Sequence, residues 1–382
     1  IGALWCITLS ACTQKGTGPA AILEPLPASR TGIDFVNQLT EGDSLNILNY
    51  IYYFNGGGVG IADLNQDGLD DIFFTGNEFS CRLYLNKGGL HFEDITEKSG
   101  LNTHCWATGV AMADVNQDGY TDIYVCAAGK PDARERANLL FLNQGPGPDG
   151  IPSFREAAAE AGIADTSYST QAAFFDYDLD GDLDLYVLNH ANQREALNTP
   201  LPKKTQGESP STDHLYRNDG QGRFSDVSRT AGIQVEGYGL GIAVSDINQD
   251  GWPDIYVSND FIYNDLLYIN QGDGTFENQI NRYLRHQSYN GMGCEIADFN
   301  NDGRQDIFVL DMQPEDRTRK KTMAGGMTYD QWNLLMDMGY DPQYVRNTLQ
   351  LNNGPSPSDS QVHFSEIGQL AGVHQTGWSW SG

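Results

Sequence analysis

The sequence predicts an all-β fold, a β-propeller made of four-stranded antiparallel blades. The first observation behind this prediction is internal repetition, because the segment GVGIADLNQDGLDDIFF at 58–74 recurs four more times. The second is that each copy is followed by two further strand-like segments joined by a short turn. Four short strands in each unit of about 50 residues are typical of a propeller blade. We therefore expect five nearly complete blades.

Each expected blade has the same order of parts: a strand, an acidic loop, a second strand, a longer connection, a third strand, a tight turn and a fourth strand. Valine, isoleucine, phenylalanine and tyrosine in these segments favour strands, and the Asn-x-Gly turns supply the positive φ that hairpins need. The later copies of the first strand pair lie at 109–125, 172–187, 241–257 and 293–309. The second strand pairs lie at 82–96, 139–157, 214–228, 266–278 and 349–368.

Glycine marks the register of the repeat. Gly100, Gly162 and Gly232 each lie fourteen positions before the first aspartate of the next acidic loop. Gly372 occupies the corresponding place near residue 382, so we expect the sequence to stop inside its next repeat. The segment 31–35 resembles the stretch that follows each fourth strand, which predicts that residues 30–57 supply a strand to another blade. The propeller is thus expected over 30–382, as part of an incomplete ring.

The charge balance points to a cationic partner. Acidic residues number 51 and basic residues 23, which gives a net charge of -28. This balance argues against nucleic-acid binding, which needs lysine and arginine gathered on one face. Many of the acids fall in five short clusters, and clustered carboxylates repel one another unless a cation holds them together.

Every acidic loop follows the pattern Asp, x, Asp or Asn, x, Asp, Gly, x, x, Asp, numbered here as positions 1 to 9. Side-chain oxygens at positions 1, 3, 5 and 9 and a backbone carbonyl at position 7 suit a hard cation that takes about six to eight oxygens. The side-chain ligand candidates are Asp63, Asn65, Asp67 and Asp71; Asp114, Asn116, Asp118 and Asp122; Asp176, Asp178, Asp180 and Asp184; Asp246, Asn248, Asp250 and Asp254; and Asp298, Asn300, Asp302 and Asp306. The carbonyl donors are Leu69, Tyr120, Asp182, Trp252 and Arg304. Position 6 is Gly68, Gly119, Gly181, Gly251 and Gly303, which permits the sharp reversal around an ion.

Calcium is the expected ion, with about one per blade. An EF-hand shares the first half of this loop but needs an acidic ligand at position 12 and flanking helices. Position 12 is apolar in every copy, namely Phe74, Val125, Val187, Val257 and Val309, so EF-hands are excluded. Magnesium is less well suited, because it prefers a rigid octahedral site with several waters. The remaining alternative, Asp-Gly turns without metal, is disfavoured by the three or more carboxylates of each loop.

These units resemble FG-GAP/VCBS repeats, the family that includes the propeller of integrin α chains and the cartilage acidic protein group. The resemblance covers roughly residues 58–373 and is most specific at the loops. The name motif itself is degenerate, since GGGVGIAD at 56–63 replaces Phe-Gly and Gly-Ala-Pro. The resemblance implies calcium in each blade and a ring of seven blades when complete. Related lipoproteins often continue into an ASPIC/UnbV domain.

The N-terminal residues are similar to a bacterial lipoprotein signal. Residues 1–11 resemble the apolar part of a secretory signal without its basic start, and about a dozen apolar residues are too few to span a bilayer. Leu9 to Cys12 resemble a lipobox, which predicts lipidation of Cys12 and a location at the bacterial cell envelope. The alternative is an ordinary signal peptide. Residues 12–29 are expected to form a flexible tether.

Four cysteines remain for the folded domain: Cys81, Cys105, Cys126 and Cys294. They could form two disulfides in an oxidising compartment. Their spacing fits no metal motif, and Cys126 and Cys294 lie in apolar runs, which favours buried free thiols.

Two connections are too long for hairpins and are where binding is expected. Residues 189–213 interrupt the third blade and 311–346 the fifth. In the second, Thr328 and Gln331 predict a helical capping box and Gly339 a helix end. An apolar stripe on this helix, Trp332, Leu335 and Met336, is expected to pack on the propeller rather than to recognise a partner. The basic run at 317–321 is expected to be a solvated loop.

No enzyme motif is evident in the sequence, and His190 and His214, which flank the first insertion, are weak catalytic candidates. The sequence therefore predicts a calcium-binding module for binding or adhesion at the cell envelope, with an extracellular protein or a polysaccharide as its partner, no nucleic acid, and membrane attachment through the lipid alone. The alternatives are a polysaccharide-active enzyme on a propeller scaffold and a purely structural scaffold.

Overall fold

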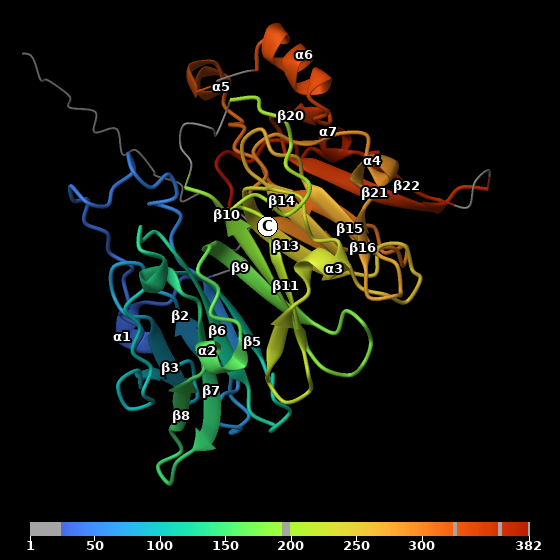
Figure 1. The fold of residues 1–382 in the computed structure, drawn as a ribbon. Coiled ribbons are helices and arrows are strands. Elements are labelled where there is room, and N and C mark those ends of the chain that lie inside the picture. Colours follow the sequence, from blue (N-terminus) through green and yellow to red (C-terminus); the bar gives the residue numbers. More distant parts are fainter. Residues whose placement is uncertain (1–23, 193–198, 324–326, 358–360, 381–382) are drawn as a thin grey trace, which may run out of the picture.

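Five four-stranded antiparallel sheets follow one another along the chain. The computed structural model describes residues 24–192, 199–323, 327–357 and 361–380 (Figure 1). In each sheet the strands lie side by side in their order along the chain, which is the order of a propeller blade. We refer to these sheets as blades 1 to 5 and to their acidic loops as loops 1 to 5. The predicted all-β, propeller-like fold is confirmed.

The strands have the following bounds. Blade 1 holds β1 (Val59–Ala62), β2 (Asp71–Phe74), β3 (Arg82–Asn86) and β4 (Phe92–Asp94). Blade 2 holds β5 (Trp106–Ala113), β6 (Asp122–Ala128), β7 (Leu139–Pro146) and β8 (Pro152–Glu156). Blade 3 holds β9 (Tyr168–Phe175), β10 (Asp184–His190), β11 (His214–Asn218) and β12 (Phe224–Asp226). Blade 4 holds β13 (Gly239–Ser245), β14 (Asp254–Asn259), β15 (Leu266–Asn270) and β16 (Phe276–Asn278). Blade 5 holds β18 (Cys294–Ala297), β19 (Asp306–Val309), β21 (Thr348–Pro355) and β22 (Val362–Glu366).

The hydrophobic core is divided among the gaps between neighbouring blades. Phe73 and Leu83 of blade 1 belong to one buried cluster with Ile123 and Phe141 of blade 2, and similar clusters join blades 2 and 3, 3 and 4, and 4 and 5. A central strand such as β6 is therefore covered on both faces and is buried at every position. This explains why the sequence of the second strand is a continuous apolar run rather than an alternating one.

The first strands of the blades approach one another closely around a common cavity. A Cβ atom at Gly109 of β5 would lie 2.5 Å from the carbonyl oxygen of Thr170 in β9, so this position requires glycine. Residues of β5, β9, β13 and β18, together with Val59 of β1, line a cavity of about 400 Å³. The five first strands thus face one axis, as in a propeller.

Short helices precede or follow the blades along the chain. They are α1 (Ala28–Thr31), α2 (Ala158–Ala161), α3 (Ser228–Ala231), α4 (Ile280–Tyr283) and α7 (Gly368–Ala371). Of these, α2, α3, α4 and α7 each contact the third strand of the blade before them. Gly162 and Gly232 end α2 and α3 with φ of 86° and 85°, and a Cβ atom at either would clash with a backbone oxygen of the next fourth strand. Gly32 ends α1 in the same way against Phe92. The predicted likeness of residues 31–35 to these connections is confirmed.

The expectation that residues 30–57 supply a strand is wrong. After α1 this segment forms turns and contains no strand. The side chains of Tyr50, Tyr52 and Tyr53 are instead buried in a cluster that also includes Trp106 and Leu335. Burial of large rings against distant parts of the chain therefore outweighs the strand preference of this tyrosine-rich run.

The described parts of the two insertions and the N-terminal turns form a cap, defined here as residues 39–56, 199–213, 311–323 and 327–346. The second insertion contains α5 (Arg317–Met323), α6 (Tyr329–Asp337) and β20 (Gln343–Tyr344), which pairs in parallel with β17 (Gln287–Ser288). Tyr340 donates a hydrogen bond from its hydroxyl to the carbonyl of Leu201 (3.0 Å), which joins the two insertions. Helices α5 and α6 lie together at one end of the molecule (Figure 1).

The helix α6 has the predicted start and end. Thr328 and Gln331 form both bonds of a capping box, and Gly339 has a φ of 83° just beyond the helix. Leu335 is buried in the aromatic cluster, and Trp332 packs on Tyr344. The basic run at 317–321 lies in helix α5, so the expectation of a loop there is wrong.

Several predictions concern other parts of the chain. The signal peptide, Cys12 and residues 12–23 of the tether lie outside the described residues, as do residues 193–198 of the first insertion. Among the helices that the structure does describe, none combines the length and apolar character that crossing a bilayer requires. Cys81, Cys105, Cys126 and Cys294 are free thiols, as expected, and the first three are buried.

Candidate metal centre

The five acidic loops lie at the end of the blades opposite the cap. Each loop joins the first and second strands of its blade, whereas both insertions join the second and third. Because successive strands are antiparallel, these two kinds of connection must emerge at opposite ends. The residues at position 12 lie inside second strands, which confirms that the loops are not EF-hands.

Position 1 is an aspartate that the loop's own backbone holds in place. One carboxylate oxygen accepts the N–H of position 5 at 2.9–3.1 Å, and the other accepts the N–H of the position 6 glycine at 2.8–3.0 Å, in all five loops. A carboxylate oxygen has two lone pairs, so these bonds leave acceptor capacity for a cation.

Position 9 is a buried aspartate that ties the loop to the blade. One oxygen of Asp122 accepts the N–H of Val115 at position 2 (3.1 Å), and the other accepts the N–H of Asn143 in the third strand (2.8 Å). Burial is the main cause that raises the pKa of Asp71 to about 6 and the pKa of Asp122, Asp184 and Asp254 to about 7. Neighbouring carboxylates contribute to these values, and the backbone hydrogen bonds oppose them. The pKa of Asp306 is also raised by burial. A cation beside them would favour the charged form.

Positions 3 and 5 differ between loop 3 and the other four loops. Where position 3 is asparagine, its amide donates to the position 5 carboxylate at 2.8–3.0 Å. The N–H of position 7 donates to the same carboxylate in every loop, at 2.9–3.0 Å. In loop 3 position 3 is Asp178, whose Oδ1 is buried and has no hydrogen-bond partner among the residues that the structure describes.

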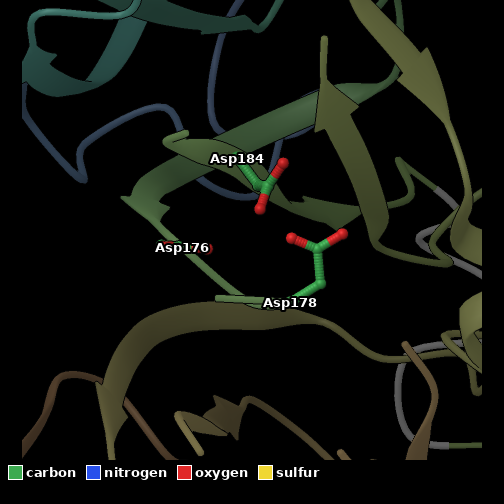
Figure 2. A group of neighbouring side chains, drawn as sticks. All are labelled: Asp176, Asp178 and Asp184. Carbon is green, nitrogen blue, oxygen red and sulfur yellow. The ribbon is translucent and has the colours of Figure 1, made fainter. Parts of the chain in front are cut away.

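Loop 3 brings three carboxylates together. Asp176, Asp178 and Asp184 each offer an oxygen, and these oxygens all lie within 4.8 Å of one another. Figure 2 shows the carboxylates of Asp178 and Asp184 turned toward each other. Two oxygens bound to one calcium ion at about 2.3–2.6 Å lie no more than about 5 Å apart. The cluster and the unpartnered buried oxygen of Asp178 therefore fit a calcium ion.

Loop 5 has a competing cation of its own. The guanidinium of Arg304, at position 7, forms an ion pair with Asp302 at position 5 and donates from Nε to the carbonyl of Asn352 (2.9 Å). This pair neutralises one of the carboxylates that an ion would use. Loop 5 is therefore the least acidic of the five sites.

The sequence pattern does not reveal the role of an asparagine near the end of the third strand in blades 2 to 5. The amide of Asn143 donates to the carbonyl of Leu64 in loop 1 (2.8 Å) and to the carbonyl of Thr121 in its own loop (3.1 Å). Asn218, Asn270 and Asn352 make the same pair of bonds in blades 3, 4 and 5. These residues belong to the Asn-x-Gly turns, but only the neighbouring blade reveals their second role.

The two histidine candidates lie in different environments. The ring of His190, at the end of β10, is buried among Tyr50, Tyr52 and Tyr168, and burial lowers its pKa to about 3. His214 instead bonds through Nδ1 to Asp165. The structure therefore does not place these two histidines in one site.

A family comparison agrees with this architecture. The FG-GAP-like repeat family matches residues 63–125, 206–257 and 246–309, which contain loops 1, 2, 4 and 5. This chain contains FG-GAP-like repeats. Loop 3, the loop with aspartate at position 3, lies outside the ranges that the FG-GAP repeat model matches.

The chain is also similar to cartilage acidic proteins and to integrin α chains. Cartilage acidic protein 1 of Xenopus tropicalis is 26% identical over 209 residues, which cover 54% of this chain and 29% of that protein. Integrin alpha-8 of Mus musculus is 30% identical over 153 residues, covering 34% of this chain and 14% of the integrin. This FG-GAP repeat chain thus spans about a third of the length of the cartilage acidic proteins it matches. Among solved structures, a lectin of Agrocybe aegerita superposes with a TM-score of 0.40 at 16% identity, over 80% of this chain and 65% of the lectin.

Proposed function

We propose that this protein is a calcium-stabilised binding or adhesion module for protein or glycan at the bacterial cell envelope, anchored through a lipid on Cys12. The observation that carries the proposal is the division of the molecule into two ends. The candidate ion ligands gather in the loops at one end, and irregular segments that vary between blades form the cap at the other. Repeat scaffolds place recognition in such variable segments.

The loops would hold calcium through the carboxylates of positions 1, 5 and 9, the oxygen of position 3 and the carbonyl of position 7. The ion supplies positive charge that offsets the repulsion between these carboxylates. The protein's own contribution is preorganisation, because the N–H groups of positions 5, 6 and 7 already orient the acids. Calcium would therefore stiffen the first hairpin of every blade.

The cap is the proposed binding face. Its surface exposes Tyr329 (79%), Leu334 (42%) and Leu201 (49%), while Lys203 and Asp341 form an ion pair at 3.7 Å that ties the insertions together. A firmly packed base with exposed apolar side chains is suited to recognition of a protein or a polysaccharide. The likeness to integrin α chains supports an adhesion role.

A glycan and protein array probed with the intact protein tests the proposal. We expect a ligand to be bound in calcium and bound more weakly in EDTA, and we expect the double variant Tyr329→Ala, Leu334→Ala to lose it. Leu370→Ala is the matched control, because Leu370 is an exposed leucine (87%) of α7 outside the cap. Equal binding by the cap variant would contradict the choice of face, and an array without any ligand would favour a purely structural scaffold.

A polysaccharide-active enzyme is the second candidate, and the pair of Asp165 and His214 favours it. Asp165 accepts from His214 and from the hydroxyl of Tyr216 (3.1 Å), beside a cavity of about 280 Å³ lined by His214 and Asp226. Burial opposes ionisation of Asp165, but the bond from His214 outweighs it and lowers its pKa to about 2. Release of reducing ends from a polysaccharide panel, lost in His214→Gln, would support this candidate over the binder.

A further inference from the structure

Position 4 of the loops carries a side chain that reaches the next blade. The amide of Gln66 in loop 1 donates to the carbonyl of Gly119 in loop 2 (2.6 Å). In the same way Gln117 of loop 2 donates to Gly181 of loop 3 (3.2 Å), and Gln249 of loop 4 donates to Gly303 of loop 5 (2.8 Å). The position 6 glycine of the following loop accepts in all three cases, and Gln117 also donates to Oδ1 of Asp182 in loop 3 (2.6 Å).

This bond acts on a ligand of the neighbouring loop. Holding the carbonyl of Gly303 fixes the peptide plane between Gly303 and Arg304, because a peptide unit is rigid. The N–H of that same peptide donates to Oδ1 of Asp302, the position 5 ligand candidate (3.0 Å). Gln249 is therefore positioned to orient a ligand in a loop to which it does not belong.

The donor end of the bond is itself set by the loop that carries it. Position 4 lies between the ligand candidates of positions 3 and 5 and has a left-handed backbone, with a φ of 61° at both Gln66 and Gln249. An ion that fixes positions 3 and 5 also fixes the direction of the glutamine between them. The coupling consequently runs in both directions, as thermodynamic linkage requires.

Loop 3 interrupts the series. Its position 4 is Leu179, which has the same left-handed backbone (φ 56°) but no group that can donate to loop 4. The asparagine bonds described above join blades 3 and 4 as they join the other blades, since Asn270 donates to Tyr177 (2.8 Å). The missing glutamine bond is thus what distinguishes this junction from its neighbours.

We infer that Gln66, Gln117 and Gln249 are positioning residues that couple calcium binding in adjacent loops, so that loops 1, 2 and 3 form one group and loops 4 and 5 another. This inference rests on the proposed calcium function. It assigns an energetic role to a side chain that is not a ligand.

Terbium luminescence on the full chain can test the coupling at loop 4. Trp252 is the one tryptophan of the sequence within an acidic loop, at position 7 of loop 4, so energy transfer from it reports on Tb³⁺ in that loop. We expect Asp302→Ala, which removes a ligand of loop 5, to weaken Tb³⁺ binding at loop 4 about two- to tenfold. Gln249→Leu should weaken Tb³⁺ binding at loop 4 by a similar factor. Adding Asp302→Ala to Gln249→Leu should then weaken it no further.

Loop 3 provides the matched control. Asp180→Ala in loop 3 should leave the affinity at loop 4 unchanged in the parent chain, and should weaken it once Leu179→Gln supplies the missing donor. Asp302→Asn is the milder variant if Asp302→Ala does not fold. The coupling is refuted if neither Asp302→Ala nor Gln249→Leu changes the affinity at loop 4, or if Asp180→Ala lowers it equally. Absence of any Trp252-sensitised signal that calcium displaces would instead refute calcium binding itself.

Discussion

Position 3 of the acidic loops shows how a single side chain sets the charge that a loop must hold. In loops 1, 2, 4 and 5 an asparagine amide bonds to the carboxylate of position 5. In loop 3 Asp178 replaces that donor with another negative charge, and burial raises its pKa, with the charges of Asp180 and Asp176 adding to the effect. Without a cation, loop 3 is therefore the most strained by repulsion.

Asp178→Asn should make loop 3 similar to the other loops. We expect the metal-free variant to be more stable than the parent by about 0.5–1.5 kcal/mol, because the new amide can bond to Asp180. The variant should gain less stability from calcium, because it has one charged ligand fewer. Thermal denaturation in EDTA and in calcium measures both effects. Asn116→Asp in loop 2 is the reciprocal control and should lower the stability of the metal-free protein. If both substitutions changed this stability in the same direction, repulsion between the loop carboxylates would not explain it.

Arg304 offers the opposite test at loop 5. Removing its charge with Arg304→Leu, which copies Leu69 of loop 1, frees Asp302 for an ion. We expect calcium to bind this loop up to about fivefold more tightly, since partly exposed ion pairs are worth about 1 kcal/mol or less. Isothermal titration calorimetry would detect the change in the weakest site. An unchanged or weaker site would show that Arg304 does not compete with the ion.

At the scale of elements, the third strand of each blade is fastened by its asparagine. The amide of Asn143 satisfies two backbone carbonyls, one of them in the preceding blade, and its own carbonyl accepts the N–H of Gly145 (3.0 Å). This one side chain thus joins a loop, a hairpin and a neighbouring blade.

Asn143→Ala should destabilise the protein by about 1–3 kcal/mol, because it leaves buried carbonyls without a donor. The cost should be the same with and without calcium, since the bonds do not involve a ligand side chain. Gln144→Ala is the control, an exposed neighbour with one weak bond (3.4 Å), and should change stability by less than about 0.5 kcal/mol. Chemical denaturation measures the free energy of unfolding of both variants. An equal loss of stability in the two would contradict the role of Asn143.

The sequence predicted elements well where local chemistry repeats. The loop pattern, the second strands and the capping box of Thr328 and Gln331 all depend on residues a few positions apart, and all are confirmed. Residues 45–54 were misjudged because their tyrosines are buried by distant partners such as Trp106. The basic run at 317–321 was predicted to be a loop because it lacks the periodic apolar residues that indicate a helix, yet it lies in α5. Hydrogen bonds between blades, such as that of Gln66, could not be predicted, because they depend on how neighbouring loops lie relative to each other in space.

At the scale of the whole molecule, buried carboxylates make stability depend on pH. Asp265, at the start of the third strand of blade 4, accepts from the N–H of Asn259 (2.8 Å) and the hydroxyl of Tyr256 (2.7 Å). Burial raises its pKa to about 7, well above the ordinary value of about 4. Asp213 occupies the same place in blade 3, and burial raises its pKa to about 7 as well.

A carboxyl whose pKa is raised by folding favours the folded state below its unfolded pKa and loses that advantage as the pH rises through its folded pKa. We therefore expect the metal-free protein to lose at least about 1 kcal/mol between about pH 5 and pH 8.5. Asp265→Asn should reduce this loss. Blade 2 shows that asparagine fits, because Asn138 accepts from Ala127 (2.8 Å) and donates to Tyr124 (3.0 Å) in the equivalent position. Denaturation curves recorded between about pH 5 and pH 8.5 measure the loss of stability in both proteins. An identical loss in Asp265→Asn would contradict the raised pKa of Asp265 as its cause.

The central claim is that calcium holds the five acidic loops together. Titration of calcium into the metal-stripped, full-length chain, followed by calorimetry and by thermal denaturation, tests it most directly. The account predicts uptake of up to five ions, one per loop, with a stability gain of about 2.7 kcal/mol for each site at a hundredfold excess over its Kd. A folded protein that takes up no calcium and melts at the same temperature with and without it would contradict the account.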